Sequence, residues 1–262
     1  HIPDFPIYSN GTKPGTLQSE HPDIANAVKQ ATDIYGFGSG GSRLTTGSGR
    51  LHLEAEAAVA RFTGYPDAVL FASGYQANIS TLQTLASPDL TIISDARNHA
   101  SIIDGCRLAK ANGSTVVVTP HRDVGGVQKA LAKRTTKHAL VVTDGLFSMD
   151  GELAPLPELS KVVEEQGAWL MVDDAHAFGT VGTTGRGLPE YFDIRPDIQL
   201  ITASKALGAE GALVATSEPV AQLLRQQARS FVFSTSPTSA NCAAITAGIK
   251  LLDTNPRLIG SL

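Results

Sequence analysis

Short apolar segments alternate with longer amphipathic segments along most of the chain. The apolar segments are rich in Val, Ile and Leu at successive positions, which is typical of strands covered on both faces in a parallel sheet. The segments between most of them carry apolar residues at helical spacing. This alternation predicts an α/β fold with a mostly parallel seven-stranded sheet and helices on both faces. The predicted strands are Ala68–Ala72, Leu90–Ser94, Thr115–Thr119, Ala139–Thr143, Trp169–Val172, Ile198–Thr202 and Ala212–Ala215.

Helix start and stop signals support the helices predicted between and around these strands. A proline lies near the start of His21–Tyr35, and Gly64 directly follows Leu51–Thr63. The segment His1–Ser19 contains three prolines and is predicted to be irregular, while Gly36–Gly49 is a glycine-rich loop. The other predicted helices are Tyr75–Leu85, Ala100–Asn112, Gly125–Arg134, Leu156–Gln166, Pro219–Ser230 and Ser239–Leu252.

Composition and charge argue against several classes of partner. The 262-residue chain has a formal net charge of −4 with 18% charged residues, so we expect neither a nucleic-acid partner nor an anionic membrane surface. Its apolar runs are far shorter than the ~18 residues of a membrane span, so no span is expected. Cys106 and Cys242 match neither a metal-ligand spacing nor a disulfide framework, which predicts a cytoplasmic protein.

Glycines and residues with hydroxyl, imidazole, carboxylate or amine groups follow five of the predicted strands. Ligands of open α/β sheets bind outside the carboxyl ends of the strands, so these residues are expected to lie near one another. Each one alone is more typical of a turn or a helix cap than of a binding site. Their coincidence at five strand ends favours a binding site. They are Ser73-Gly74-Tyr75, Asp95 with His99, Asp144-Gly145 leading to Ser148, Asp173-Asp174-Ala175-His176, and Thr202-Ala203-Ser204-Lys205.

The residue types at these strand ends match the parts of pyridoxal 5′-phosphate. Ser73-Gly74-Tyr75 opens a predicted helix whose free N–H groups suit a phosphate, and the hydroxyls of Thr202 and Ser204 could bind the same group. Lys205, in a loop after a strand, is a candidate for a Schiff base with a carbonyl. His99 offers a flat ring, and Asp173 offers a buried carboxylate that needs a cation. The cofactor supplies an aldehyde, an aromatic face, a ring nitrogen and a phosphate.

Competing motifs fit the sequence less well. The glycines of Gly36–Gly41 are similar to a dinucleotide-binding loop, but no predicted strand precedes them. The sequence lacks a GxxxxGK[ST] phosphate loop, a GxSxG nucleophile turn and an HExxH zinc motif. A nucleotide-binding oxidoreductase is therefore disfavoured, and no metal site is expected.

With these residues in view, the sequence resembles the α-oxoamine synthases, a family of fold-type-I enzymes that depend on pyridoxal phosphate. The similarity runs from about Tyr8 to the end of the chain. The resemblance implies that most of the chain is the large domain of a fold-type-I transferase. The matching stretches are GFGSGGSRLTTGSGRLH (Gly36–His52), FASGYQAN (Phe71–Asn78), DARNHASI (Asp95–Ile102), TDGLFSMDGELAPL (Thr143–Leu156), MVDDAHAFGTVGTTGRG (Met171–Gly187), TASKALG (Thr202–Gly208) and FVFSTSPT (Phe231–Thr238).

The resemblance implies catalytic roles for four residues and a supporting role for a fifth. Lys205 would hold the cofactor covalently and carry the Cα proton of the substrate. Asp173 would pair with the pyridinium nitrogen, and His99 would stack on the ring. His176 and Ser148 would form hydrogen bonds near the phenolic oxygen of the ring.

The resemblance also implies how the phosphate is held. Gly74, Tyr75, Thr202 and Ser204 would bind it within one chain. Thr235 would reach the phosphate of a neighbouring subunit, which implies a homodimer with shared active sites.

The implied reaction joins an amino acid to an acyl thioester, either acyl-CoA or acyl-ACP, with loss of carbon dioxide, and it gives an α-amino ketone. The motifs GSRLTTG, FSMDGELAPL and VDDAH are most similar to the 8-amino-7-oxononanoate synthases, which join alanine to a pimeloyl thioester in biotin synthesis. The 2-amino-3-ketobutyrate ligases, serine palmitoyltransferases and autoinducer synthases share most motifs, and TAS in TASKALG favours the last group. A catalytically silent homologue that acts as a dimer partner is a further alternative.

Some features depart from the family pattern. Gly11–Leu17 differs from the family near the expected substrate entrance, and Glu210 stands where small residues are usual. We expect an N-terminal segment with the glycine-rich loop at residues 1–50 and a cofactor-binding domain at 51–240. Residues 241–262 would start the helix that leads to the small C-terminal domain of the family, and nothing in this sequence corresponds to that domain.

Overall fold

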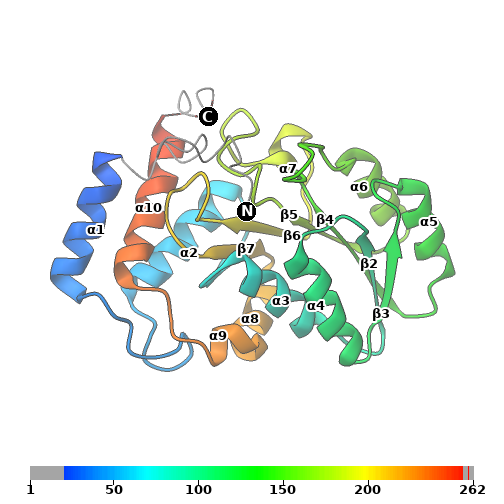
Figure 1. The fold of residues 1–262 in the computed structure, drawn as a ribbon, viewed down its shortest axis with the longest axis horizontal. Coiled ribbons are helices and arrows are strands. Elements are labelled where there is room, and N and C mark those ends of the chain that lie inside the picture. Colours follow the sequence, from blue (N-terminus) through cyan, green and yellow to red (C-terminus); the bar gives the residue numbers. More distant parts are fainter. Residues whose placement is uncertain (1–20, 256–258, 260–262) are drawn as a thin grey trace, which may run out of the picture.

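A seven-stranded sheet runs through the middle of the molecule, and helices lie on both of its faces (Figure 1). The structure is a computed structural model that describes residues 21–255 and Ile259, so His1–Ser19 and Gly11–Leu17 lie outside the described residues. Each strand begins and ends within one residue of its predicted bounds. The strands are β1 (Asp67–Phe71), β2 (Leu90–Asp95), β3 (Thr115–Thr119), β4 (His138–Asp144), β5 (Trp169–Asp173), β6 (Ile198–Thr202) and β7 (Ala212–Thr216).

The strand order is β1-β7-β6-β5-β4-β2-β3. Strands β2, β3, β4, β5 and β6 are parallel to their neighbours among themselves, whereas β7 runs antiparallel to both β6 and β1. The predicted mostly parallel seven-stranded sheet is therefore confirmed. The register pairs Asp144 at the end of β4 with Asp173 at the end of β5, which brings two carboxylates to the same edge of the sheet.

The predicted helices are all present, with two local differences. The segment predicted as one helix over Pro219–Ser230 is broken at Ala228, whose backbone is extended, and gives α8 and α9. The four-residue helix α7 was not expected, because so short a helix has no detectable periodicity. The helices are α1 (Pro22–Tyr35), α2 (Arg50–Thr63), α3 (Gly74–Leu85), α4 (Ala100–Ala111), α5 (Val124–Lys133), α6 (Leu156–Glu165), α7 (Leu188–Tyr191), α8 (Glu218–Gln227), α9 (Arg229–Val232) and α10 (Ser239–Thr254).

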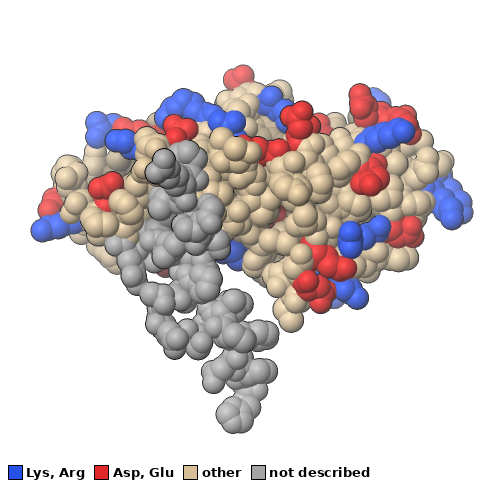
Figure 2. All heavy atoms as spheres, turned by 90° about the horizontal axis from the view of Figure 1, so that it is seen from above, with Lys and Arg blue, Asp and Glu red and all other residues tan. Residues whose placement is uncertain are grey.

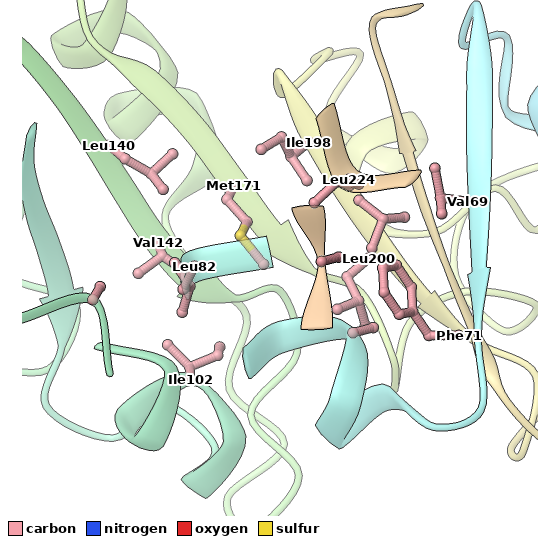
Figure 3. Packing of buried hydrophobic residues seen from close by; sticks show 14 of the residues in the cluster. Val69, Phe71, Leu82, Ile102, Leu140, Val142, Met171, Ile198, Leu200 and Leu224 are labelled. Atoms are coloured by element: carbon pink, nitrogen blue, oxygen red, sulfur yellow. The ribbon is translucent and has the colours of Figure 1, made fainter. Parts of the chain in front are cut away.

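Two hydrophobic layers cover the sheet and explain the unbroken apolar runs of its strands. On one face α3, α4, α8 and α9 pack over the strands, and Figure 3 shows Leu82 and Ile102 from these helices beside Leu140, Val142 and Met171 from the sheet. On the other face α2 and α10 cover β1, β6 and β7, while α5 and α6 cover β2, β4 and β5. Successive strand residues point to opposite faces, so both must be apolar.

The surface carries charges of both signs. On the face shown in Figure 2, basic and acidic side chains lie beside one another along the edges, so the described residues give this face a mixed electrostatic character. Among the helices described between residues 21 and 255, none is both long and apolar enough to cross a membrane.

A buried ion pair anchors the glycine-rich loop to the domain. Arg43 in this loop contacts Glu56 on α2 at 2.9 Å, and each side chain is only 3% exposed. Glu56 also accepts a hydrogen bond of 2.9 Å from the backbone N–H of Leu70 on β1. A second cation, Arg225 on α8, lies 3.4 Å from the other carboxylate oxygen. The loop, α2, β1 and α8 are thus joined through one buried carboxylate.

We expect Arg43→Met to lower the free energy of unfolding by about 3–5 kcal/mol, because it leaves the buried Glu56 without its closest cation. Arg50→Met is the matched control, since Arg50 forms an ion pair with Glu54 while 71% exposed, and such pairs contribute less than about 1 kcal/mol. Equilibrium unfolding in urea measures both. Equal losses in the two variants would contradict the structural role given to Arg43.

Candidate active site

A cavity of about 170 Å³ lies at the carboxyl edge of the parallel strands. Nine of the ten residues predicted from the sequence line this cavity, and Thr235 does not. Two larger hollows of the molecule, of about 420 and 440 Å³, contain none of the ten. The cavity is lined by Gly74, Tyr75, Asn78, His99, Ser101, Asp144, Ser148, Asp173, Ala175, His176, Thr202, Ser204 and Lys205.

Asp173 is the last residue of β5, and it lines the cavity. The residue is 5% exposed. Its Oδ2 accepts a hydrogen bond of 2.6 Å from Asn78 Nδ2, and its Oδ1 accepts one of 3.1 Å from the backbone N–H of Ala175. Burial raises the pKa of Asp173, while these bonds and the positive charge of Lys205 oppose the rise. A cation bound in the cavity would therefore find a partially compensated carboxylate beside it.

Lys205 lies in the turn that follows β6, and its side chain is partly buried. Burial lowers the pKa of this amine, and the negative charges of Asp173 and Asp144 only partly reverse the effect. A lysine with a lowered pKa is more often unprotonated, which is the form that attacks a carbonyl carbon.

His99 and His176 approach the cavity from different strand ends. His99 is the N-cap residue of α4, and its backbone N–H donates a hydrogen bond of 2.9 Å to Asp144 Oδ2. Burial, followed by the positive charge of Lys205, lowers the pKa of His176 to about 4. His176 is therefore neutral at pH 7 and can accept one hydrogen bond and donate another.

Ser148 reaches the cavity from the loop after β4, and hydrogen bonds hold this loop in place. Phe147 N–H donates to the carbonyl of Glu152 at 2.9 Å. The His121 ring bridges Asp95 Oδ1 and Glu152 Oε2, each at 2.9 Å. The loop is thus tied to the ends of β2 and β3.

The expected phosphate residues lie together at the start of α3. Ser73 caps this helix by accepting a hydrogen bond of 3.1 Å from Gln76 N–H. A Cβ at Gly74 would lie 2.7 Å from Thr202 Cγ2, so only glycine lets the helix begin this close to β6. The free N–H groups of this first turn are suited to an anion.

Two of the hydroxyls at this end of the cavity already have protein partners. Thr202 Oγ1 donates to the carbonyl of Ala175 at 3.2 Å, and the Tyr75 hydroxyl donates to Asp104. Ser204 is exposed at the cavity. The roles of Tyr75, Thr202 and Ser204 in phosphate binding therefore stay predictions.

Thr235 lies apart from the cavity, on an exposed segment after α9. It forms an isolated β-bridge with Ser42 of the glycine-rich loop. The next residue, Ser236, is buried and lies 2.7 Å from His52 Nε2 through its Oγ. These contacts fix the segment on its own subunit, and the reach of Thr235 into a neighbouring subunit stays a prediction.

Sequence reasoning gave no role to three further residues of the cavity. Asn78 and Ser101 are buried and hydrogen-bonded to one another, and Asp144 lies beside Asp173 in the sheet. Burial, and then the negative charge of Asp173, raise the pKa of Asp144 to about 8. The only sequence signals were that all three residues fall within matching motifs and that Asp144 follows a predicted strand.

Asp174, in contrast, has a structural role in its surroundings. Its Oδ1 accepts from the N–H of Leu188 at the start of α7, and its Oδ2 accepts from Gln199 Nε2 at 2.9 Å. A Cβ at Gly187 would lie 1.6 Å from Asp174 Oδ2, so glycine is required there. The second carboxylate of the VDDAH motif therefore holds the loop before α7 against the sheet.

Comparison with known proteins identifies the family of this chain. The sequence family described as aminotransferase class I and II matches residues 14–256. The chain belongs to this family. The names of the relatives described next confirm the resemblance to the α-oxoamine synthases.

Two curated proteins are similar to this chain over most of its length. The biotin biosynthesis bifunctional protein BioWF of Corynebacterium kroppenstedtii is 43% identical over 93% of this chain and 39% of the relative. The 8-amino-7-oxononanoate synthase of Mycolicibacterium smegmatis is 45% identical over 91% of this chain and 63% of the relative. The chain thus spans less than two thirds of the length of either protein.

A solved structure shares the fold. Serine palmitoyltransferase from S. paucimobilis, in a variant with bound PLP–myriocin aldimine, has a TM-score of 0.88 and 33% sequence identity to this chain. The match covers 94% of this chain and 65% of that one. The fold-type-I large domain expected from the sequence is therefore confirmed.

The raised pKa of Asp144 predicts a pH-dependent stability. The unfolded chain releases this proton at the usual carboxyl pKa, whereas the folded protein keeps it up to about pH 8. Stability is therefore lost as the pH rises through this window. Asp144→Asn still accepts the His99 N–H, so without added cofactor it should be more stable than the parent by on the order of 2 kcal/mol at pH 8.

Thermal unfolding at pH 5 and pH 8 measures the effect, with the exposed Asp33→Asn as the control. The advantage of Asp144→Asn should shrink at pH 5, and Asp33→Asn should match the parent at both values. An advantage that does not depend on pH would contradict the raised pKa.

Proposed function

We propose that this chain binds pyridoxal 5′-phosphate and catalyses the decarboxylative condensation of an amino acid with an acyl thioester. One observation carries the proposal: a buried carboxylate, Asp173, and a lysine of lowered pKa, Lys205, line the same small cavity. Each alone has structural explanations, but a pyridine ring with an aldehyde calls for both.

The described residues fit the cofactor in both charge and shape. Asp173 would hold the ring nitrogen, Lys205 would hold the aldehyde carbon, and His99 would lie against the ring. The first turn of α3 would hold the phosphate, and the absence of a side chain at Gly74 lets this turn lie close to Thr202. When bound, pyridoxal phosphate supplies a carbonyl for amines and a ring that accepts electrons from the substrate Cα.

The residues of the chain would then divide the proton chemistry. Hydrogen bonds from Asn78 and the backbone of Ala175 favour the ionised form of Asp173, which would keep a proton on the ring nitrogen. Lys205, once free, would take the Cα proton of the amino acid and later return it to the product. His176 is neutral and would form a hydrogen bond to the phenolic oxygen together with Ser148.

The proposed reaction is that of 8-amino-7-oxononanoate synthase, in which L-alanine condenses with pimeloyl-CoA or pimeloyl-ACP. Support comes from the motifs GSRLTTG, FSMDGELAPL and VDDAH, and from 45% identity to a synthase of that name. The fold likeness to serine palmitoyltransferase makes condensation of serine with an acyl thioester the second candidate, at the lower identity of 33%.

We further propose the organisation in which this reaction takes place. Residues 1–50 would form an N-terminal segment with the glycine-rich loop, 51–240 the cofactor-binding domain, and 241–262 the start of a connecting helix. Two chains would form a homodimer in which the exposed Thr235 reaches the partner's phosphate. The free, buried Cys106 and Cys242 suit a reducing cytoplasm.

Borohydride reduction tests the cofactor proposal. Protein incubated with pyridoxal phosphate and then reduced should carry one stable adduct, located on Lys205 by tandem mass spectrometry. Lys205→Ala should lose the adduct, and Lys250→Ala, which removes an exposed lysine of α10, should keep it. An adduct on another lysine, or none in the protein given cofactor, would contradict the proposal.

A panel of amino acids tests the substrate. The cofactor-loaded protein is mixed with pimeloyl-CoA and either alanine, glycine or serine, and carbon dioxide release and product mass are measured. Alanine should give 8-amino-7-oxononanoate at a rate at least about tenfold above the others, which corresponds to about 1.4 kcal/mol of discrimination. Preference for serine would instead favour the second candidate.

A further inference from the structure

We propose that Asn78 and Ser101 form a directional hydrogen-bond chain from Asp173 to His99, and that this chain fixes the tautomer of the His99 ring. Asn78 Nδ2 lies 2.6 Å from Asp173 Oδ2 and 2.9 Å from Ser101 Oγ. Ser101 Oγ in turn lies 2.7 Å from His99 Nδ1. Asn78 is 1% exposed and Ser101 is fully buried, so water does not compete for these bonds.

The direction of each hydrogen bond between Asp173 and His99 follows from the donors that each group has. Both oxygens of Asp173 face N–H donors, Asn78 Nδ2 at one and the backbone of Ala175 at the other. Asp173 thus accepts at both oxygens, and Asn78 directs its amide nitrogen at Oδ2. The same nitrogen has a second proton, which it donates to Ser101 Oγ.

The opposite orientation of the Asn78 amide is unfavourable beside an ionised Asp173. It would place the carbonyl oxygen 2.6 Å from a carboxylate oxygen, and two acceptors repel at that distance. The observed orientation leaves Asn78 Oδ1 buried without a partner among the described residues. The hydrogen bond to Asp173 therefore sets the amide orientation and leaves that oxygen without a partner in the described part of the chain.

Ser101 then donates a hydrogen bond to His99. Its hydroxyl accepts from Asn78, so its single proton is available for His99 Nδ1. The backbone N–H of Ser101 also donates to the same ring nitrogen, at 3.3 Å. A ring nitrogen that accepts two hydrogen bonds carries no proton. The ring proton of His99 is therefore placed on Nε2.

Asp144 holds the backbone of His99 in place. Its Oδ2 accepts the backbone N–H of His99 at 2.9 Å, while the ring is held through Nδ1. In the part of the chain that the structure describes, Nε2 has no hydrogen-bond partner. If the proposed function holds, a substrate oxygen beside His99 meets an N–H donor there. Asn78 and Ser101 are positioning residues in this account, because they act through His99.

Nitrogen-15 NMR of the cofactor-free full chain with labelled histidine measures the tautomer directly. The His99 signals are assigned by their loss in His99→Asn. The parent protein should show an unprotonated Nδ1 and a protonated Nε2. Ser101→Ala removes the hydroxyl donor and should add a clear fraction with protonated Nδ1, whereas Ser101→Thr restores a hydroxyl and should restore the single tautomer.

Ser80→Ala is the matched control, because Ser80 is an equally buried serine whose hydroxyl pairs with Ser230, outside the cavity. It should leave the His99 signals unchanged. A protonated Nδ1 in the parent, or a tautomer that Ser101→Ala does not alter, would overturn the proposal. These spectra need no cofactor, so a failure of the borohydride test leaves this result interpretable on its own.

Discussion

The structure depends on the burial of a carboxylate at the end of a strand that is covered on both faces. Asp173 ends β5 at 5% exposure, where an ionised group is costly unless hydrogen bonds and a cation compensate it. Asn78, Ala175 and Lys205 supply part of that compensation. The arrangement is suited to a ligand with a cationic ring nitrogen, and the other polar residues of the cavity surround the place where such a ligand would bind.

The parallel sheet brings together polar residues that lie far apart in the sequence. Its register sets Asp144 beside Asp173, and their mutual repulsion and burial favour a proton on Asp144. The two carboxyl groups then differ in function, since Asp173 accepts two N–H donors that favour its ionised form and Asp144 accepts the His99 backbone N–H. The same pair thus supports His99 from two sides, through Asn78 and Ser101 at the ring and through Asp144 at the backbone.

The fold and the strand-end residues were predictable because their signals are local. Seven apolar runs gave seven strands, and the residues after five of them line the cavity. The break at Ala228 and the four-residue α7 were not, since packing and the Asp174 contacts set them. The contact of Asn78 with Asp173 joins residues 95 positions apart, so no pattern in the sequence reports it. The hydroxyl partners of Tyr75 and Thr202 are likewise tertiary.

The protonation state of the bound ring nitrogen tests the central claim most directly. Pyridoxal phosphate labelled with nitrogen-15 in the ring is bound to the parent protein and to Asp173→Asn, which keeps the shape but removes the charge. The account predicts a protonated ring nitrogen in the parent and an unprotonated one in Asp173→Asn. An unprotonated nitrogen in the parent, or a protonated one in both, would contradict it.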